Sequence, residues 1–93
     1  MISYGKQSIN QDDIDAVVDV LKSDFLTQGP KVVEFENDLA NYCEAKYAKA
    51  VNNGTAALHL AYLAIGLEQG DIVWTTPNTF VATANAALYC GAT

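Results

Sequence analysis

The fold of this chain is decided by the eight residues Val51-Asn52-Asn53-Gly54-Thr55-Ala56-Ala57-Leu58. An apolar run over residues 48–51 ends here and a helical pattern over residues 55–65 begins, which predicts a strand, a glycine turn and a helix in succession. The first N–H groups of a helix have no partner within the helix and lie at the positive end of its dipole. The junction therefore indicates an anion site, where a phosphate would accept several N–H hydrogen bonds at once.

Gly54 and Thr55 each have two interpretations at this junction. Gly54 would let the backbone approach a phosphate closely, and the hydroxyl of Thr55 could donate a further hydrogen bond. Alternatively, Gly54 only makes a tight turn and Thr55 only caps the helix, as at many short Gly-Thr junctions. The eight residues alone leave both interpretations open.

The composition is that of a short, acidic and apolar chain. It has 93 residues, a net charge of −6 and lysine as its only strongly basic residue, which argues against nucleic acid or an anionic membrane as a partner. No apolar run approaches the roughly 18–20 residues that cross a bilayer. Hydrophobic residues make up 51% of the chain, above the usual share of about 45–50% with glycine included. This excess predicts a core that packs against more chain or another subunit.

The cysteines and the N-terminal residues bear on the compartment and on metals. Cys43 and Cys90 lie in helical stretches without the spacing of metal ligands, so we expect buried free thiols and no metal. Residues 1–6 lack the charged-then-apolar pattern of a signal peptide, so we expect a cytoplasmic protein.

Hydrophobic periodicity predicts helices that alternate with short strands in the second half of the chain. The expected helices cover residues 8 or 10 to about 22, 31–43, 55–67 and 80–89, and the expected strands cover residues 46–51 and 72–75. This order favours an α/β layer with a parallel sheet. Because two strands do not make an independently stable sheet, we expect the chain to be an N-terminal piece of something larger.

Several single residues mark the ends of these helices. Ser8 with Gln11 and Asn10 with Asp13 both have the spacing of a capping box for the first helix, and both remain open. Pro30 suits the first turn of the second helix.

The later helices and the second strand carry further expectations. Gly91 is expected to end the fourth helix, and the third helix is apolar nearly all round, which predicts burial on several sides. His59 is interpreted as a packed or surface histidine, because no Ser, Cys or Asp is placed to work with it. Trp74 is interpreted as a core or interface residue without a role in a site.

Three segments, taken in order, resemble one protein family. They are Leu26-Thr27-Gln28-Gly29-Pro30-Lys31-Val32 leading to Phe35-Glu36, Val51 to Ala61, and Thr76 to Ala86 with Gly91-Ala92. Together they resemble the N-terminal segment of the DegT–StrS type sugar-nucleotide aminotransferases, which are pyridoxal phosphate (PLP) enzymes of the aspartate-aminotransferase fold, PLP fold type I. The resemblance implies an α/β fold in which residues 1–93 form the N-terminal arm, the helices and the first strands of the large domain, packed on a parallel-type sheet. The rest of that domain and the C-terminal small domain would lie outside this chain.

The resemblance also assigns roles to individual residues. Gly54, Thr55 and Ala56 would hold the PLP phosphate, and Phe80 would stack on its pyridine ring. The sugar nucleotide would face Tyr4, Asp24, Phe25, Leu26, Thr27 and Gly54. From the residues alone, Phe80 is equally an ordinary core residue, and Phe25 and Leu26 are equally core anchors.

Transamination needs a lysine that forms a Schiff base with PLP and a carboxylate beside the pyridine nitrogen. In the family both lie downstream of these segments, and the lysines here, Lys6, Lys22, Lys31, Lys46 and Lys49, do not match that context. We therefore expect no catalytic residue in this chain and no activity from it alone.

Within the family, the nearest resemblance is to the group that transaminates a UDP-linked 4-keto-6-deoxy-N-acetyl sugar, with glutamate as amino donor, on the route to pseudaminic acid. Such enzymes work as homodimers with shared sites. Two alternatives remain open: a non-catalytic module that binds phosphate or a nucleotide sugar, and an α/β fragment that only dimerises through its apolar excess.

Overall fold

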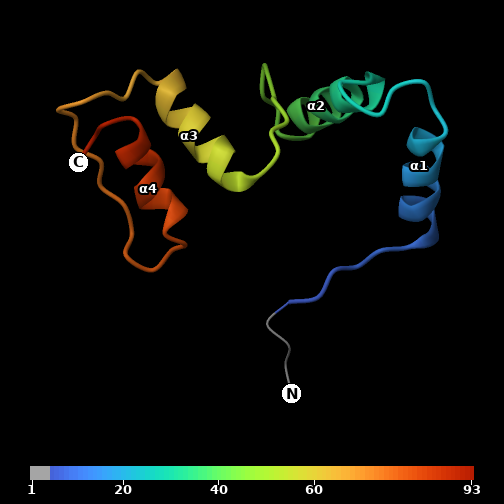
Figure 1. Ribbon diagram of the computed structural model, residues 1–93, viewed down its shortest axis with the longest axis horizontal. Helices are drawn as coiled ribbons and strands as arrows, with labels where there is room; N and C mark the ends of the chain where they lie inside the picture. The colour runs from blue at the N-terminus through green and yellow to red at the C-terminus, as the bar shows by residue number, and fades with distance from the viewer. Residues whose placement is uncertain (1–4) are drawn as a thin grey trace. The chain divides into compact units, whose positions relative to one another are not determined.

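The computed structural model describes residues 5–93, in which helices are joined by irregular segments. The described helices are α1 (Gln11–Leu21), α2 (Pro30–Tyr42), α3 (Gly54–Ala64) and α4 (Ala82–Tyr89) (Figure 1). The chain divides into two compact units, the first ending at Ala50 and the second spanning Val51–Thr93. None of the described helices is long and apolar enough to cross a membrane.

In the first unit, α1 begins at a capping box centred on Asn10. The Asn10 side chain accepts a hydrogen bond from the Asp13 N–H at 3.0 Å, and the Asp13 carboxylate accepts one from the Asn10 N–H at 2.9 Å. Such a cap stabilises a helix by about 1 kcal/mol. Of the two caps that the sequence left open, Asn10 is confirmed and Ser8 is wrong.

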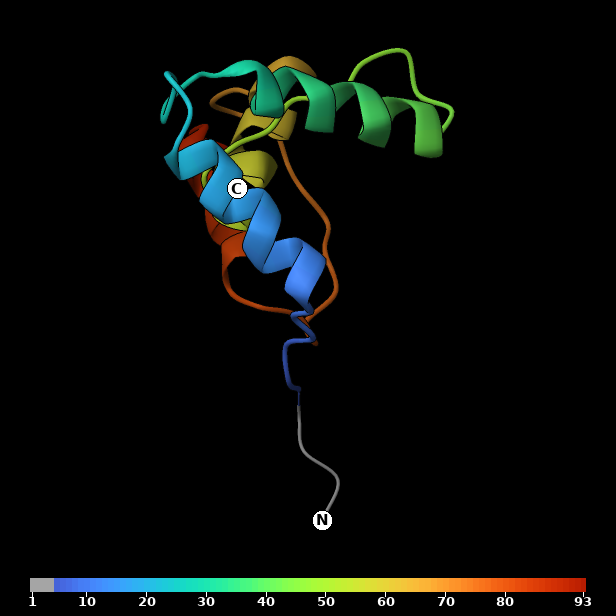
Figure 2. The ribbon, with the colours of Figure 1, turned by 90° about the vertical axis from the view of Figure 1, so that its right-hand side faces the viewer.

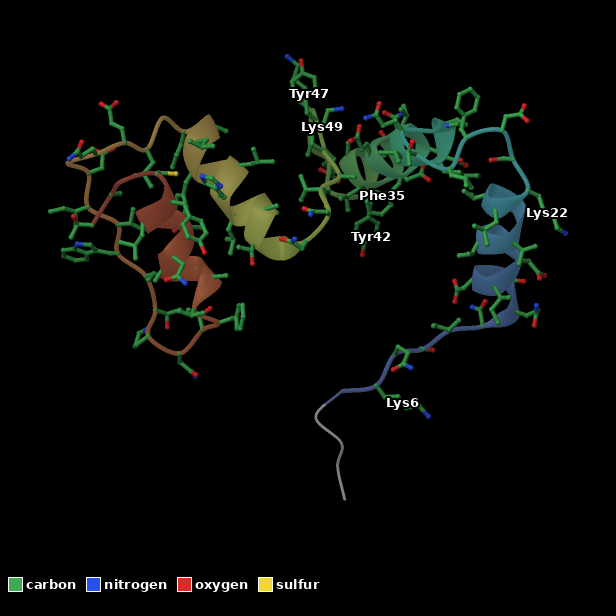
Figure 3. The ribbon with its side chains drawn as sticks, viewed as in Figure 1. Lys6, Lys22, Phe35, Tyr42, Tyr47 and Lys49 are labelled. Carbon is green, nitrogen blue, oxygen red and sulfur yellow. The ribbon has the colours of Figure 1, made fainter. Side chains whose placement is uncertain are left out.

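The loop after α1 leads into α2 (Figure 2). The first residue of α2 is Pro30, as predicted. Glu36 of α2 contacts the segment that follows the helix. Its carboxylate accepts a hydrogen bond from the Ala50 N–H at 2.9 Å and pairs with the Lys49 Nζ at 2.6 Å. Lys49 is labelled in Figure 3 on the extended segment beyond α2. The Glu36 side chain therefore holds this segment against α2.

The expected strands, residues 46–51 and 72–75, do not form regular strands within residues 5–93, so that part of the prediction is wrong. A parallel strand depends on hydrogen bonds from strands beside it, which a lone segment does not have. One step of a parallel ladder is nevertheless present in the second unit. The Val73 N–H donates to the Thr93 carbonyl at 2.9 Å, and the Thr93 N–H donates to the Asp71 carbonyl at 2.9 Å. Ile72 and Thr93 thereby lie opposite each other in parallel register.

The second unit is organised by the packing of α3 against α4, which lie side by side in Figure 1. The buried residues at this packing and just beyond it are small: Ala82, Ala86, Ala87 and Ala92. The Tyr62 hydroxyl donates to the Thr83 carbonyl at 3.4 Å. His59 packs edge-on against the Tyr89 ring, with 5.5 Å between ring centres, so the interpretation of His59 as a packed residue is confirmed.

The expected burial of several large side chains is wrong for this chain. Within α3, all of whose residues are described, none is buried, although the apolar pattern predicted burial on several sides. Trp74 is 93% exposed, which rules out a core position in this structure. Cys43 is exposed and Cys90 is half-buried, so neither free thiol is buried. A chain this short offers too few layers to cover its apolar surface.

Helix α4 ends at Tyr89 in a Schellman motif, and Gly91 is the stop residue that the sequence predicted. Gly91 has a φ of +83°, its N–H donates to Leu88, and the Ala92 N–H donates to Ala87. Helix α2 ends in the same way with Glu44 at the left-handed position, where φ is +51°. A residue with a Cβ pays about 1–2 kcal/mol for this conformation, so Glu44 marks a weak point of the first unit.

Candidate functional site

The N-terminal end of α3 is the first component of the candidate site. Asn53 is the cap residue in an extended conformation, and Gly54, Thr55 and Ala56 form the first turn. Among the described residues, no acceptor bonds to the N–H of Gly54 or of Thr55. These two donors lie at the positive end of the helix dipole and are available to an anion.

The third N–H of this turn is already used. The Asn53 side-chain Oδ1 accepts a hydrogen bond from the Ala56 N–H at 2.8 Å. The Asn53 carbonyl accepts the next one, from Ala57, at 3.1 Å. The resemblance assigned Ala56, together with Gly54 and Thr55, to the PLP phosphate. For Ala56 this role stays a prediction, and in this structure its N–H donates to the Asn53 side chain.

A pocket of about 600 Å³ joins this helix end to the segment before α4. It is lined by Gly54, Thr55, Ala57, Leu58, Ala61, Phe80, Ala82 and Thr83. The structure thus brings together three of the residues that the resemblance assigned to the cofactor: Gly54, Thr55 and Phe80. Phe80 is 75% exposed, so its alternative interpretation as a core residue is wrong here.

The lining of this pocket suits a planar ring that carries a phosphate. Its lining includes Gly54 and Thr55, whose N–H groups have no acceptor among the described residues, and the exposed Phe80; the other lining residues are alanine, leucine and Thr83. Its volume falls within the roughly 300–1,000 Å³ of small-molecule sites. Among these lining residues there is no lysine or carboxylate, so the described pocket holds binding groups rather than groups that transfer protons.

Of the predicted sugar-nucleotide residues, Asp24 to Thr27 lie in the first unit, on the loop between α1 and α2, whereas Gly54 begins α3 in the second unit. Phe25 and Leu26 are 61% and 64% exposed, so their interpretation as core anchors is wrong here. They line a smaller pocket of about 190 Å³ together with the start of α2. Asp24 and Thr27 are exposed on the same loop. Tyr4 lies outside the described residues.

Sequence reasoning missed two residues that shape the segment around the junction. Asn53 precedes Gly54 and belongs to the residue types that favour a helix cap, which was a usable signal. Glu36 had no such signal beyond its place in a family-like segment. Its side chain is only 12% exposed, and hydrogen bonds from Lys49 and the Ala50 N–H hold the pKa of its carboxyl below the usual value.

Comparison with known protein families and sequences gives one consistent result. A family described as the DegT/DnrJ/EryC1/StrS aminotransferases matches residues 7–93. Two similar proteins, from two strains of Campylobacter jejuni, are each named UDP-4-amino-4,6-dideoxy-N-acetyl-beta-L-altrosamine transaminase. They are 54% and 52% identical over 92 residues. Each match covers 99% of this chain and 24% of the relative, so the chain spans about a quarter of their length.

Solved structures agree with this result. The putative sugar aminotransferase Spr1654 from Streptococcus pneumoniae, in its PMP form, superposes with a TM-score of 0.92 at 33% identity. The match covers 99% of this chain and 23% of that one, and the PLP form of Spr1654 matches with the same TM-score. The expected fold, the N-terminal part of an aminotransferase of PLP fold type I, is thereby confirmed, although the strands are irregular in this chain.

Proposed function

The chain belongs to the DegT/DnrJ/EryC1/StrS aminotransferase family, and from this premise we propose that it contributes the phosphate end and one ring face of a PLP site. The observation that carries the proposal is the pocket shared by Gly54, Thr55 and Phe80. Gly54 and Thr55 begin α3, and Phe80 lies just before α4, which packs on α3. They offer hydrogen-bond donors for a phosphate and an aromatic face for the pyridine ring. The whole protein is then a sugar-nucleotide aminotransferase, and residues 1–93 are the N-terminal part of its large domain.

In this proposal each residue has a defined task. The N–H groups of Gly54 and Thr55, with the Thr55 hydroxyl, donate hydrogen bonds to the phosphate at the positive end of α3. The Phe80 ring lies against the face of the pyridine ring and fixes its plane. When bound, PLP supplies the electron sink through which an amino group passes from donor to acceptor. The protein chain supplies binding and orientation.

We propose a UDP-linked 4-keto-6-deoxy-N-acetyl-hexose as the acceptor substrate, with glutamate as amino donor, in the synthesis of pseudaminic acid. The relatives from Campylobacter jejuni support this choice, because their name describes a UDP-linked 4-amino-4,6-dideoxy-N-acetyl sugar. Asp24 to Thr27 and Tyr4 are the residues proposed to face that sugar nucleotide. A homodimer that shares its sites belongs to the same proposal.

No lysine of this chain is assigned the covalent bond to PLP. Lys49 is engaged by Glu36 at 2.6 Å, and Lys31 is engaged by Glu34 at 2.6 Å on the exposed face of α2. Neither residue lines the pocket that contains Gly54 and Phe80. The cofactor is therefore held in this part of the protein by hydrogen bonds and ring contact alone.

A titration of the 93-residue chain with PLP, followed by borohydride reduction and peptide mass mapping, tests this assignment. We expect reversible binding that inorganic phosphate competes away, and no reduced adduct on a lysine of the chain. Specific trapping of PLP on Lys49 would contradict it. Binding of UDP in the absence of any PLP binding would instead support the non-catalytic module.

A further inference from the structure

We infer that Asn53 is a positioning residue for the phosphate seat, by which we mean the N–H groups of Gly54 and Thr55 with the Thr55 hydroxyl. Asn53 takes the third N–H of the turn, that of Ala56, so that the first turn of α3 is held in shape and two donors remain for the ligand. This inference rests on the proposed function and adds a residue to it.

The geometry of Asn53 fixes the turn at two points. Its backbone is extended, with φ of −164° and ψ of 168°, which directs the side chain over the helix end. The side-chain oxygen lies 2.8 Å from the Ala56 nitrogen, and the main-chain oxygen lies 3.1 Å from the Ala57 nitrogen. One residue therefore satisfies two consecutive donors, and the two donors before them have no acceptor among residues 5–93.

The lining of the pocket separates the same donors. Gly54 and Thr55 line it, whereas Ala56 does not. The donor that Asn53 occupies thus belongs to a residue outside the ligand space, and the two unoccupied donors belong to residues inside it. An oxygen of PLP phosphate could bind the seat without breaking the bond between Asn53 and Ala56.

The cap of α3 is also neutral, which matters for an anion. In α1 the cap includes the carboxylate of Asp13, and Asp12 adds a second negative charge in the first turn. The first turn of α3 contains no acidic residue, and its capping atom is an amide oxygen. A carboxylate at position 53 would make an equally good cap but would repel a phosphate at the same helix end.

Three substitutions of Asn53 separate these contributions. Asn53→Ser keeps a capping oxygen, Asn53→Ala removes it, and Asn53→Asp keeps it while adding a charge. Each 93-residue variant would be titrated with PLP and, separately, with inorganic phosphate, while amide NMR resonances and hydrogen exchange of residues 54–56 are followed.

In the wild type we expect saturable shifts at Gly54 and Thr55 and a clearly smaller shift at Ala56. Asn53→Ala should lower the protection of the Ala56 amide and weaken PLP binding by about fivefold, the amount expected for a lost cap. Asn53→Ser should restore both within about twofold. Asn53→Asp should keep the protection of Ala56 and still weaken binding.

The inference is overturned if PLP shifts Ala56 as strongly as Gly54 in the wild type, or if Asn53→Ala binds PLP as tightly as the wild type does. The first of these results does not depend on a variant that folds. The absence of any response at residues 54–56 to PLP or phosphate would instead refute the proposed cofactor site itself, and the inference with it.

Discussion

Replacing Gly54 with alanine should strengthen the fold and weaken the site. Gly54 is the first residue of α3, and a Cβ built on it meets no atom within 4 Å. Its backbone does not have the positive φ that would require glycine. A compatible Gly→Ala change stabilises a protein by about 0.4–1 kcal/mol, largely by restricting the unfolded chain. The fold therefore gives no reason for glycine at this position.

The ligand does give a reason, because a phosphate oxygen must approach the Gly54 N–H to about 2.9 Å. A hydrogen bond to a charged group contributes about 1.5–3 kcal/mol. If the added methyl group prevents that approach, PLP binding should weaken by roughly 10- to 100-fold. Stability and affinity should thus change in opposite directions.

Urea unfolding followed by circular dichroism gives the stability of Gly54→Ala, and a spectroscopic PLP titration gives its affinity. Gly5→Ala is the matched control, since a Cβ there also meets nothing within 4 Å and Gly5 lies outside the pocket. Unchanged PLP affinity in Gly54→Ala would refute the close approach of the phosphate. A clear loss of stability would show that Gly54 serves the fold.

Two further predictions concern the first unit. Glu44→Gly should raise the free energy of unfolding by about 0.5–1 kcal/mol, because glycine relieves the left-handed strain at φ +51°; urea unfolding measures this, and Glu44→Ala should give no such gain. A hydrogen bond from Lys49 lowers the pKa of the Glu36 carboxyl. The ionised carboxylate therefore stabilises the folded chain at neutral pH, and this contribution is lost as the pH falls below 4.5, the usual pKa of a glutamate. Glu36→Gln should reduce this loss of stability when the free energy of unfolding is measured from about pH 7 to about pH 3; equal slopes in wild type and Glu36→Gln would refute this role.

The features of the fold that depend only on residues close together in the sequence could be predicted. Pro30 and Gly91 mark helix ends through local backbone preferences, and both were located correctly. The strands at 46–51 and 72–75 could not be settled in this way, because strand formation depends on partners distant in sequence. The one parallel pairing described, that of Ile72 with Thr93, involves a residue outside both expected strands.

Some residues of the candidate site could likewise be recognised from local sequence, and others could not. Gly54 and Thr55 were recognised from a local junction, and within the described part of the chain their N–H groups have no acceptor. Phe80 joins them only through the packing of α3 on α4, which no local pattern describes, and the family resemblance supplied that link. The hydrogen bond from the Ala56 N–H to the Asn53 side chain could be found only from atomic distances. Exposure of Trp74 likewise depends on how many layers cover it.

The most direct test of the central claim is the difference in affinity between PLP and pyridoxal, which has the same ring without the phosphate. If the N-terminal end of α3 holds the phosphate, PLP should bind at least about 10-fold more tightly, since each charge-assisted hydrogen bond contributes about 1.5–3 kcal/mol. Equal affinities for the two compounds would show that the phosphate makes no specific contact with Gly54 and Thr55, and would contradict the account.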